Sequence, residues 1–379
     1  MDRSELALFN DNTMKLGTFC QNVSQGTFMT TAEGTLTPTW AENARIATTL
    51  DAAGWEFLLP LGRWRGLGGQ IDFNSRSLEV FTWASAVAAI THQIHVFCTA
   101  HVPIWHPLQT AKLSTTIDHV GNGRMGLNVV AGWNDWEFGM FGIGVRGHDD
   151  RYAVADEWMT IVKRIWTEHE PFDFDGTYYQ LKSVFMEPKP IQQPYPVVVN
   201  AGQSDAGIRF GAKHADISFQ SLTDHDAMAA LVAKAKRAAF EVDKRDLGVI
   251  VPCPVICRDT EKEVQDYLKY VVDERGDWEA GRQLVEFMMG GDVRSVSYDT
   301  VHKLERDLIS GWAGYQLFGT PEQIVDKLIG LSKIGVNGVA LSWVDYEAGI
   351  ENFNAKVLPL MEQAGLRKAY VPAHPKVAV

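Results

Sequence analysis

The sequence predicts an α/β fold, and within that class a (β/α)8 TIM barrel with insertions, from three observations. Strand-like and helix-like segments alternate from end to end of the 379 residues. The strand-like runs are continuously apolar, as expected for parallel strands that are covered on both faces. About eight such strands occur without a Pro/Ser-rich linker between them, which favours a barrel. A doubly wound open sheet is the alternative.

Each expected strand is a short apolar run that ends at a turn or a polar segment. The expected strands are Met14–Cys20, Trp55–Leu61, Ile94–Val102, Met125–Ala131, Pro196–Asn200, Ile217–Gln220, Leu247–Cys257 and Val336–Val344. Each expected helix repeats apolar residues at helical spacing. The expected helices are Glu42–Ala53, Ser77–His92, Leu108–Val120, Arg151–Glu168, Ala206–His214, Ala227–Val242, Thr260–Arg275 and Thr320–Ile334.

The last helix and strand carry the clearest local signals. Thr320 is a typical N-cap, Pro321 suits the first turn, and Gln323 completes a capping box. Gly335 is a good helix stop, and a fully apolar strand follows it.

We expect one domain over residues 1–379, with two insertions and a tail. Phe172–Leu181 is typical of an inserted hairpin. Trp278–Tyr315 is expected to be a helical insertion that is broken at Gly290-Gly291. The tail, Leu366–Val379, is basic and contains proline, so it is either disordered or wrapped on a neighbouring subunit.

Composition and charge argue against several classes of function. The net charge is −12 and the basic residues are scattered among acids, which disfavours nucleic acid and anionic membrane as partners. The first residues lack the pattern of a signal peptide, and the longest apolar run, near Phe81–Ile90, is too short to cross a membrane. We therefore expect a soluble, cytoplasmic protein. The four cysteines lie in apolar runs, so buried free thiols are expected.

Three other kinds of site have little support. Gly142–Gly147 matches a dinucleotide fingerprint in its letters, but a long loop is expected before it instead of the required strand. His95, His101 and His106 cluster in sequence without a paired histidine and carboxylate on one helix, so no metal site is predicted. No serine occupies a strand-turn elbow, which leaves hydrolase chemistry unsupported.

Polar groups near two strand ends suit a binding site, because the carboxyl ends of barrel strands build the active site. Gly202–Gly207 leads from a strand into a helix start that suits an anion, and an ordinary turn with a serine N-cap is the equal alternative. Asn128 closes an apolar strand before Gly132-Trp133, and Thr99 lies in the preceding strand. Because buried amides need partners, Asn128 is either a core amide or a donor to a polar ligand.

Together the motifs resemble the luciferase-like flavin monooxygenases, most closely the pyrimidine oxygenases, and the dimethylsulfone monooxygenases are similar too. Each matching stretch is weak alone, but the order and spacing of the set are specific to the family. The stretches span residues 14 to 362 and include Arg65–Gly69, Thr99-Ala100, Thr116–Asp118, Gly123-Arg124, Asn128–Trp133, Arg151-Tyr152, Pro188–Pro190, Ala201–Gly207 and Gly319–Pro321.

The resemblance implies roles for individual residues. The positions that match an FMN phosphate site are Tyr152, Gly202, Gln203 and Ser204. The positions around the flavin ring and bound oxygen are Thr99, Ala100 and Asn128, of which Thr99 and Asn128 are the catalytic candidates. The positions near the substrate are Arg63, Trp133 and Glu137, and Trp64 and Trp105 add aromatic surface that favours a flat ring.

The resemblance also implies a two-component monooxygenase that uses reduced FMN and O2. A separate NAD(P)H-dependent flavin reductase would supply reduced FMN, and a flavin peroxide would oxygenate and ring-open a small pyrimidine- or pyridine-like N-heterocycle. An organosulfur compound is the second candidate substrate. A deazaflavin-dependent oxidoreductase and a non-catalytic flavin-binding protein are the rival functions. By the same resemblance we expect a homo-oligomer, either a dimer or a tetramer.

Overall fold

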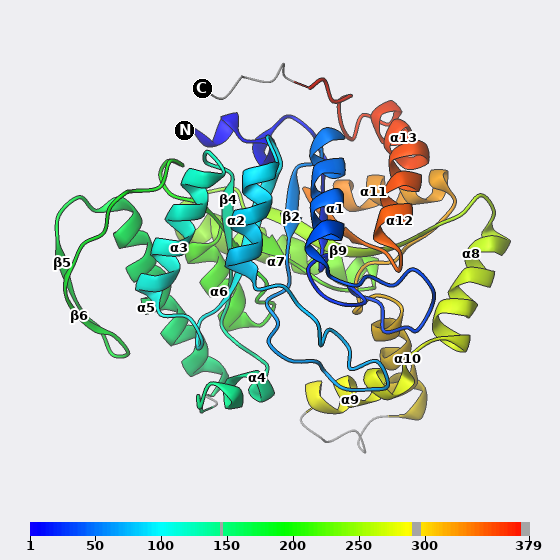
Figure 1. The fold of residues 1–379 in the computed structure, drawn as a ribbon, viewed down its shortest axis with the longest axis horizontal. Coiled ribbons are helices and arrows are strands. Elements are labelled where there is room, and N and C mark those ends of the chain that lie inside the picture. The colour runs from blue at the N-terminus through cyan, green and yellow to red at the C-terminus, as the bar shows by residue number, and fades with distance from the viewer. Residues whose placement is uncertain (145–146, 290–296, 373–379) are drawn as a thin grey trace. The chain divides into compact units, whose positions relative to one another are not determined.

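The computed structural model confirms the predicted (β/α)8 fold: in the residues it describes, eight parallel strands close into a barrel surrounded by helices (Figure 1). The structure describes residues 1–144, 147–289 and 297–372. The expected break at Gly290-Gly291 lies outside the described residues, as do parts of Gly142–Gly147 and of the C-terminal tail.

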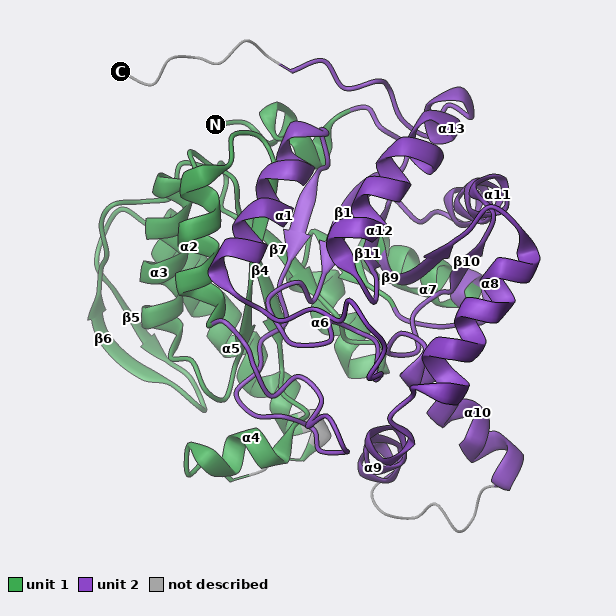
Figure 2. Cartoon of the chain, turned by 45° about the vertical axis from the view of Figure 1, so that its right-hand side comes forward, with its two compact units in different colours: residues 1–10, 79–220, 230–250 green, residues 11–78, 221–229, 251–379 purple. Residues whose placement is uncertain are grey.

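The chain divides into two compact units, which Figure 2 shows in different colours. Unit 1 comprises residues 1–10, 79–220 and 230–250, and unit 2 comprises residues 11–78, 221–229 and 251–379. The expectation of a single domain stays a prediction.

Unit 1 contains the strands whose polar residues were singled out above. Its elements are α2 (Val80–Ile90), β3 (His95–His101), α3 (Pro107–Val120), β4 (Met125–Val130), α4 (Asp135–Met140), α5 (His148–Thr167), β5 (Phe172–Asp175), β6 (Gln180–Val184), β7 (Val197–Asn200), α6 (Asp205–His214), β8 (Ile217–Phe219), most of α7 (His225–Asp243) and the start of β9 (Gly248–Cys257). In parallel, β3 pairs with β4, β4 with β7, β7 with β8, and β8 with β9. Helices α2, α3 and α5 pack side by side (Figure 1).

Unit 2 contains both the first and the last strand of the chain. Its elements are β1 (Lys15–Phe19), α1 (Trp40–Ala52), β2 (Phe57–Leu59), the end of β9, α8 (Glu261–Leu268), α9 (Trp278–Met288), α10 (Tyr298–Ile309), β10 (Leu317–Gly319), α11 (Pro321–Lys333), β11 (Gly338–Ser342), α12 (Tyr346–Asn352) and α13 (Leu358–Gln363). Strand β1 pairs with β2 and with β11, and the short β10 pairs with the end of β9. Short π-helical turns follow α8 and α12.

Three local expectations need correction. The predicted hairpin exists, but its second strand continues to Val184 because β5 and β6 pair over a longer stretch than the apolar letters suggest. Residues 135–140 form helix α4, although we expected loop, because a helix of under two turns is too short to produce a readable period. The three-residue β10 escaped notice for the same reason.

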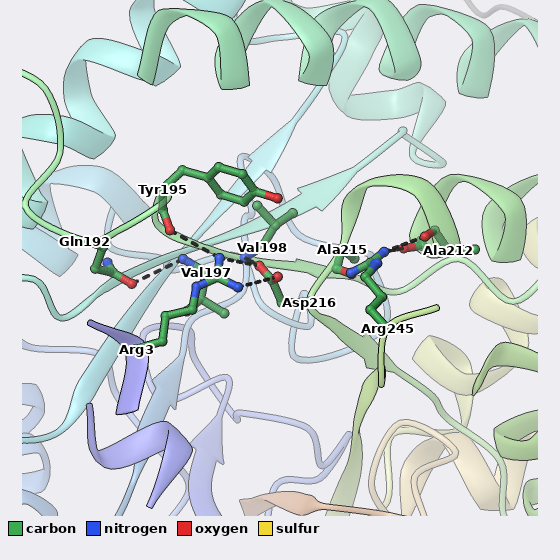
Figure 3. A network of polar contacts seen from close by, with 10 residues as sticks. Arg3, Gln192, Tyr195, Val197, Val198, Ala212, Ala215, Asp216 and Arg245 are labelled. Carbon is green, nitrogen blue, oxygen red and sulfur yellow. Dashed lines mark hydrogen bonds and ion pairs between the residues drawn. The ribbon is translucent and has the colours of Figure 1, made fainter. Parts of the chain in front are cut away.

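A polar network closes the amino ends of β7 and β8 in unit 1 (Figure 3). Arg3 makes two bonds to the carboxylate of Asp216, at 2.6 and 3.0 Å, and donates to the carbonyl of Tyr195 at 3.2 Å. The same carboxylate accepts from the backbone N–H of Val198 at 2.8 Å. These charges are paired, as expected at the end of a barrel that serves stability, so the candidate site is sought at the carboxyl ends of the strands.

All four cysteines are buried free thiols, which confirms the expectation from their apolar surroundings. Within the described residues, no helix has both the length and the apolar character that a membrane crossing requires.

Candidate functional site

Strands β3 and β4 bring together the two residues that were expected to be catalytic. Thr99 and Asn128 are register partners, and Asn128 Nδ2 donates to Thr99 Oγ1 at 3.2 Å. Both side chains are buried, and Ala100 beside them is fully buried. Among the residues that the structure describes, nothing donates to the buried Oδ1 of Asn128. An amide that is fixed at one end and has a buried acceptor left at the other suits a ligand with a hydrogen-bond donor.

Helix α6 begins at a tight glycine turn just after the carboxyl end of β7. Its N-cap is Ser204, whose Oγ accepts from the Gly207 N–H at 3.2 Å. A Cβ on Gly202 would lie 2.6 Å from Gly207 Cα and 2.6 Å from the Tyr152 hydroxyl, so a larger residue does not fit. A Cβ on Gly207 would meet the same hydroxyl at 2.7 Å. The turn therefore brings the Tyr152 hydroxyl against the start of the helix, where the first N–H groups lack partners within the helix.

This helix start has the chemistry of an anion site. The Tyr152 and Ser204 side chains are hydrogen-bonded to each other. Burial raises the pKa of Tyr152, and the bond with Ser204 and the charge of Arg151 only partly oppose that rise. Tyr152 is therefore neutral and able to donate near neutral pH. Two hydroxyls at the positive end of a ten-residue helix suit a phosphate, and the half-buried Gln203 lies in the same turn.

An ion-pair cluster connects α5, which carries Tyr152, to α6. Asp156 lies one turn after Tyr152 and accepts from His214 Nε2 at 2.8 Å and from Lys213 Nζ at 2.7 Å. The hydrogen bond from His214 lowers the pKa of Asp156 to about 2, with Lys213 contributing. Burial lowers the pKa of His214. The cluster therefore holds the two helices of the anion site together.

The segment after β4 turns sharply at Gly132. Its φ is +104°, and a Cβ there would lie 2.6 Å from the Phe138 ring, so both the backbone and the packing require glycine. Arg151 Nη1 donates to the Gly132 carbonyl, which holds this turn against the start of α5. Trp133, a predicted substrate-binding residue, follows the turn and is half-buried.

Helix α4 presents polar groups on its buried side. Asn134, Glu137 and Phe138 have exposed fractions of 1%, 1% and 2%. Trp136 on the same helix is exposed. Residues three and four apart share a helix face, so the amide and the carboxylate lie on the side that carries Phe138.

A small cavity of about 140 Å³ lies beside this helix in unit 1. Its wall is mostly apolar, with one cation and one phenol. The lining residues are Val102, Pro103, Ala131, Phe138, Ile143, Gly144, Arg151, Val154 and Tyr179. The cavity therefore borders the loops that follow β3 and β4.

Trp105 contributes to packing as well as to the loop after β3. Its ring meets Phe81 edge-on at a centroid distance of 4.8 Å, and its carbonyl accepts from Trp158 Nε1 at 2.7 Å. Trp105 is half-buried, so one part of the ring stays accessible.

Arg63 and Trp64 belong to unit 2. Arg63 is buried, and its guanidinium carbon lies 6.0 Å from the centroid of the Trp312 ring. Its carbonyl accepts from Ser77 Oγ at 2.9 Å. Trp64 is exposed at 36%.

A family model for luciferase-like monooxygenases matches residues 14–338. The chain belongs to this family. It is therefore a flavin-dependent monooxygenase, as the motifs predicted. A pyrimidine monooxygenase of Pantoea ananatis is 30% identical over 363 residues, which cover 92% of this chain and 96% of that protein.

Two solved structures show the same fold at low sequence identity. DmoA from Hyphomicrobium sulfonivorans superposes with a TM-score of 0.81 at 21% identity, over 96% of this chain and 91% of that one. A riboflavin lyase, solved with modified FMN and riboflavin, superposes with a TM-score of 0.82 at 20% identity, over 95% and 94%.

Sequence reasoning overlooked three residues of this region. Gly207 was quoted in a motif but given no role, and its close approach to Gly202 appears only in three dimensions. The spacing of Asp156, four residues after Tyr152, could have indicated a shared helix face. Asn134 had no signal beyond its place after Trp133, since nothing in the letters shows that the side chain is buried.

Proposed function

We propose that this monooxygenase binds reduced FMN, supplied by a separate NAD(P)H-dependent flavin reductase, and uses O2 to oxygenate and ring-open a small N-heterocycle. Bound reduced FMN supplies the electrons that activate O2 for transfer of one oxygen atom to the substrate. The residues of the chain bind, orient and shield these reactants.

The observation that carries the proposal is the start of α6. The contact of Gly202 with Gly207 leaves no room for a Cβ, so no side chain of these two residues covers the backbone at this turn. Ser204 and Tyr152 add two hydroxyls, and Arg151 adds positive charge beside Tyr152. A terminal phosphate fits this set, because helix N–H groups and hydroxyls both donate to its oxygens. FMN has such a phosphate and riboflavin does not.

The Thr99–Asn128 pair supports an oxygenation centre beside β3 and β4. The hydrogen bond between them fixes the Asn128 amide plane, and its buried Oδ1 suits a donor on the flavin ring or on the substrate. Burial keeps water away from both groups, which strengthens their hydrogen bonds to a ligand. Replacement of Asn128 would therefore affect coupling of O2 use to product more than binding of the flavin phosphate.

The substrate class rests on the relatives and on the α4 region. A pyrimidine monooxygenase at 30% identity supports a polar ring, and Trp133 and Trp105 supply half-buried aromatic surface for a flat one. Glu137 supplies a buried acceptor for ring N–H groups. Arg63 and Trp64 stay proposed substrate-binding residues on the family resemblance alone.

An organosulfur substrate is the second candidate, on the resemblance of the motifs to the dimethylsulfone monooxygenases. Such a compound offers oxygen acceptors but no ring N–H, so it makes less use of Glu137. A deazaflavin in place of FMN and a flavin carrier without turnover are the remaining rivals.

The test is an anaerobic titration of the purified protein with reduced FMN, reduced riboflavin and a reduced deazaflavin, followed by admission of air with pyrimidines, pyridines or sulfones. We expect FMN to bind more tightly than riboflavin, and O2 uptake to match product only with an N-heterocycle. Equal affinity for FMN and riboflavin would show that the phosphate adds nothing to binding, which would contradict the proposed phosphate site. Binding without any coupled product would favour a flavin carrier, and turnover of sulfones alone would favour the organosulfur reading.

A further inference from the structure

We propose that Asn134 is a specificity-determining residue that recognises the lactam or ureide edge of the substrate, where a ring C=O stands next to a ring N–H. This inference rests on the proposed function, because it names the part of an N-heterocycle that the site recognises. No role was assigned to Asn134 from its sequence context.

The first observation is that the Asn134 amide is buried without partners. Only 1% of the residue is exposed, and neither Nδ2 nor Oδ1 has a hydrogen-bond partner in the described part of the chain. Leaving a buried amide unpaired is costly, and native structures rarely do so. Such a side chain is expected to gain its partners from a ligand.

The second observation is that Asn134 does not perform the structural task of its position. It is the N-cap of α4, where asparagine normally accepts from a backbone N–H of the first turn. Here no side-chain capping bond forms. The backbone alone contributes, since the Asn134 carbonyl accepts from the Phe138 N–H at 3.2 Å. The capping preference therefore does not explain an amide at this place.

The third observation is the surroundings of the amide. Asn134 follows Gly132 and Trp133 at the exit of β4, and Glu137 lies one turn later on the same buried side of α4. Phe138, whose backbone N–H donates to the Asn134 carbonyl, lines the 140 Å³ cavity. A polar side chain that binds a ligand here would act beside an aromatic ring and a carboxylate.

The chemistry of the amide selects the ligand. Nδ2 donates and Oδ1 accepts in one plane, so the complement is a planar group with an acceptor and a donor side by side. The C=O and N–H of a cyclic amide provide this pair. A sulfone provides acceptors only, and a pyridine provides a single acceptor, so either would leave Oδ1 unpaired. Asn134 therefore discriminates between the two substrate classes considered above.

The experiment compares Asn134→Asp and Asn134→Leu with the wild-type enzyme, using uracil and dimethyl sulfone as probes. Aspartate matches asparagine in size but lacks the donor at neutral pH. A merely structural role predicts lower stability of both variants, measured by urea unfolding, with kcat/KM of the folded enzyme unchanged. We expect both variants to lose about 100-fold or more in kcat/KM for uracil, mainly through KM, with unchanged affinity for reduced FMN. The control is Asp135→Asn, an exposed change on the same helix, which should leave all constants unchanged.

A pH profile sharpens the test. A protonated aspartic acid both donates and accepts, so Asn134→Asp should recover activity toward uracil as the pH is lowered, whereas Asn134→Leu should not. If the wild-type enzyme turns over uracil and Asn134→Asp is equally active at pH 7.5, this inference is wrong and the proposed function is unaffected. A wild-type enzyme that turns over dimethyl sulfone but no cyclic amide overturns both.

Discussion

Helices α6 and α11 begin in nearly the same way and yet do different things. Each follows a strand and a glycine, and each has a hydroxyl N-cap, Ser204 in α6 and Thr320 in α11. At α11 the capping box is closed: Thr320 Oγ1 accepts from the Gln323 N–H, and the Gln323 side chain accepts from the Thr320 N–H at 3.0 Å. At α6 no capping box forms. Instead, the Tyr152 hydroxyl lies beside the glycine turn and is hydrogen-bonded to Ser204.

The first turns of these two helices show how a turn that binds a ligand differs from one that only completes a helix. In α11, Pro321 removes one N–H, the capping box occupies others, and Glu322 adds negative charge to the first turn. That start is satisfied by its own residues. The first turn of α6 also carries an acid, Asp205, but Lys234 pairs with it at 2.6 Å. The space beside this turn is kept open by two glycines and bordered by the hydroxyls of Tyr152 and Ser204. The same local motif can therefore complete a helix or receive a ligand, according to what fills its first turn.

The largest expected effect that separates the two turns comes from adding one methyl group to each. Gly202→Ala should weaken binding of reduced FMN by about 10- to 100-fold, because the new Cβ collides with the Gly207 backbone and the Tyr152 hydroxyl. Gly319→Ala before α11 is the matched control, since its Cβ would meet Gln323 Oε1 at 2.8 Å and Gln323 Cβ at 2.9 Å, a comparable crowding at a helix start to which no phosphate role is given. Fluorescence titration measures both. Similar losses in the two variants would mean that general destabilisation, and no phosphate site, explains the effect.

Much of the fold was readable from sequence, because strand burial and helix spacing repeat over many residues. The barrel strands and the α11 capping box were predicted with their boundaries nearly right. Helix α4 was not, because its six residues give no period. The same limit applies to function, since Gly202 was predicted from its motif, whereas the burial of Asn134 depends on how distant segments pack.

A smaller effect is expected from removal of single hydroxyl groups. Tyr152→Phe should weaken FMN about tenfold and riboflavin hardly at all, because only the phosphate bond is lost. Thr320→Ala should lower the free energy of unfolding by about 1 kcal/mol without changing flavin affinity, because it removes the capping bond and the bond from Thr320 Oγ1 to Glu322, both within α11. Calorimetry of flavin binding and urea unfolding would measure these. If Tyr152→Phe weakened FMN and riboflavin equally, Tyr152 would not contact the phosphate.

The smallest expected effect concerns the pH dependence of the bridge between α5 and α6, which α11 lacks. Burial lowers the pKa of His214, while its bond to Asp156 partly opposes this. The folded chain therefore keeps the ring neutral at a pH where the unfolded chain takes up a proton. The stability that this contributes is present above the ordinary histidine pKa and is lost as the pH falls below about 6.5. The low pKa of Asp156, about 2, means that its carboxylate stays charged throughout this range.

Replacing His214 with glutamine isolates this contribution, since glutamine can donate to Asp156 but does not titrate. Between pH 7.5 and 5.0 we expect the wild-type protein to lose more of its free energy of unfolding than His214→Gln does. His95, whose pKa burial lowers to about 3, adds an acid-dependent loss of the same sign, but both proteins contain it and it cancels in the difference. FMN affinity should fall more steeply with falling pH in the wild type than in His214→Gln, because the bridge positions Tyr152 and Ser204, whereas protonation of the phosphate at about pH 6 affects both proteins alike. Identical pH profiles for stability in the two proteins would show that His214 has the same pKa in the folded and unfolded chain. The bridge would then not make FMN binding depend on pH.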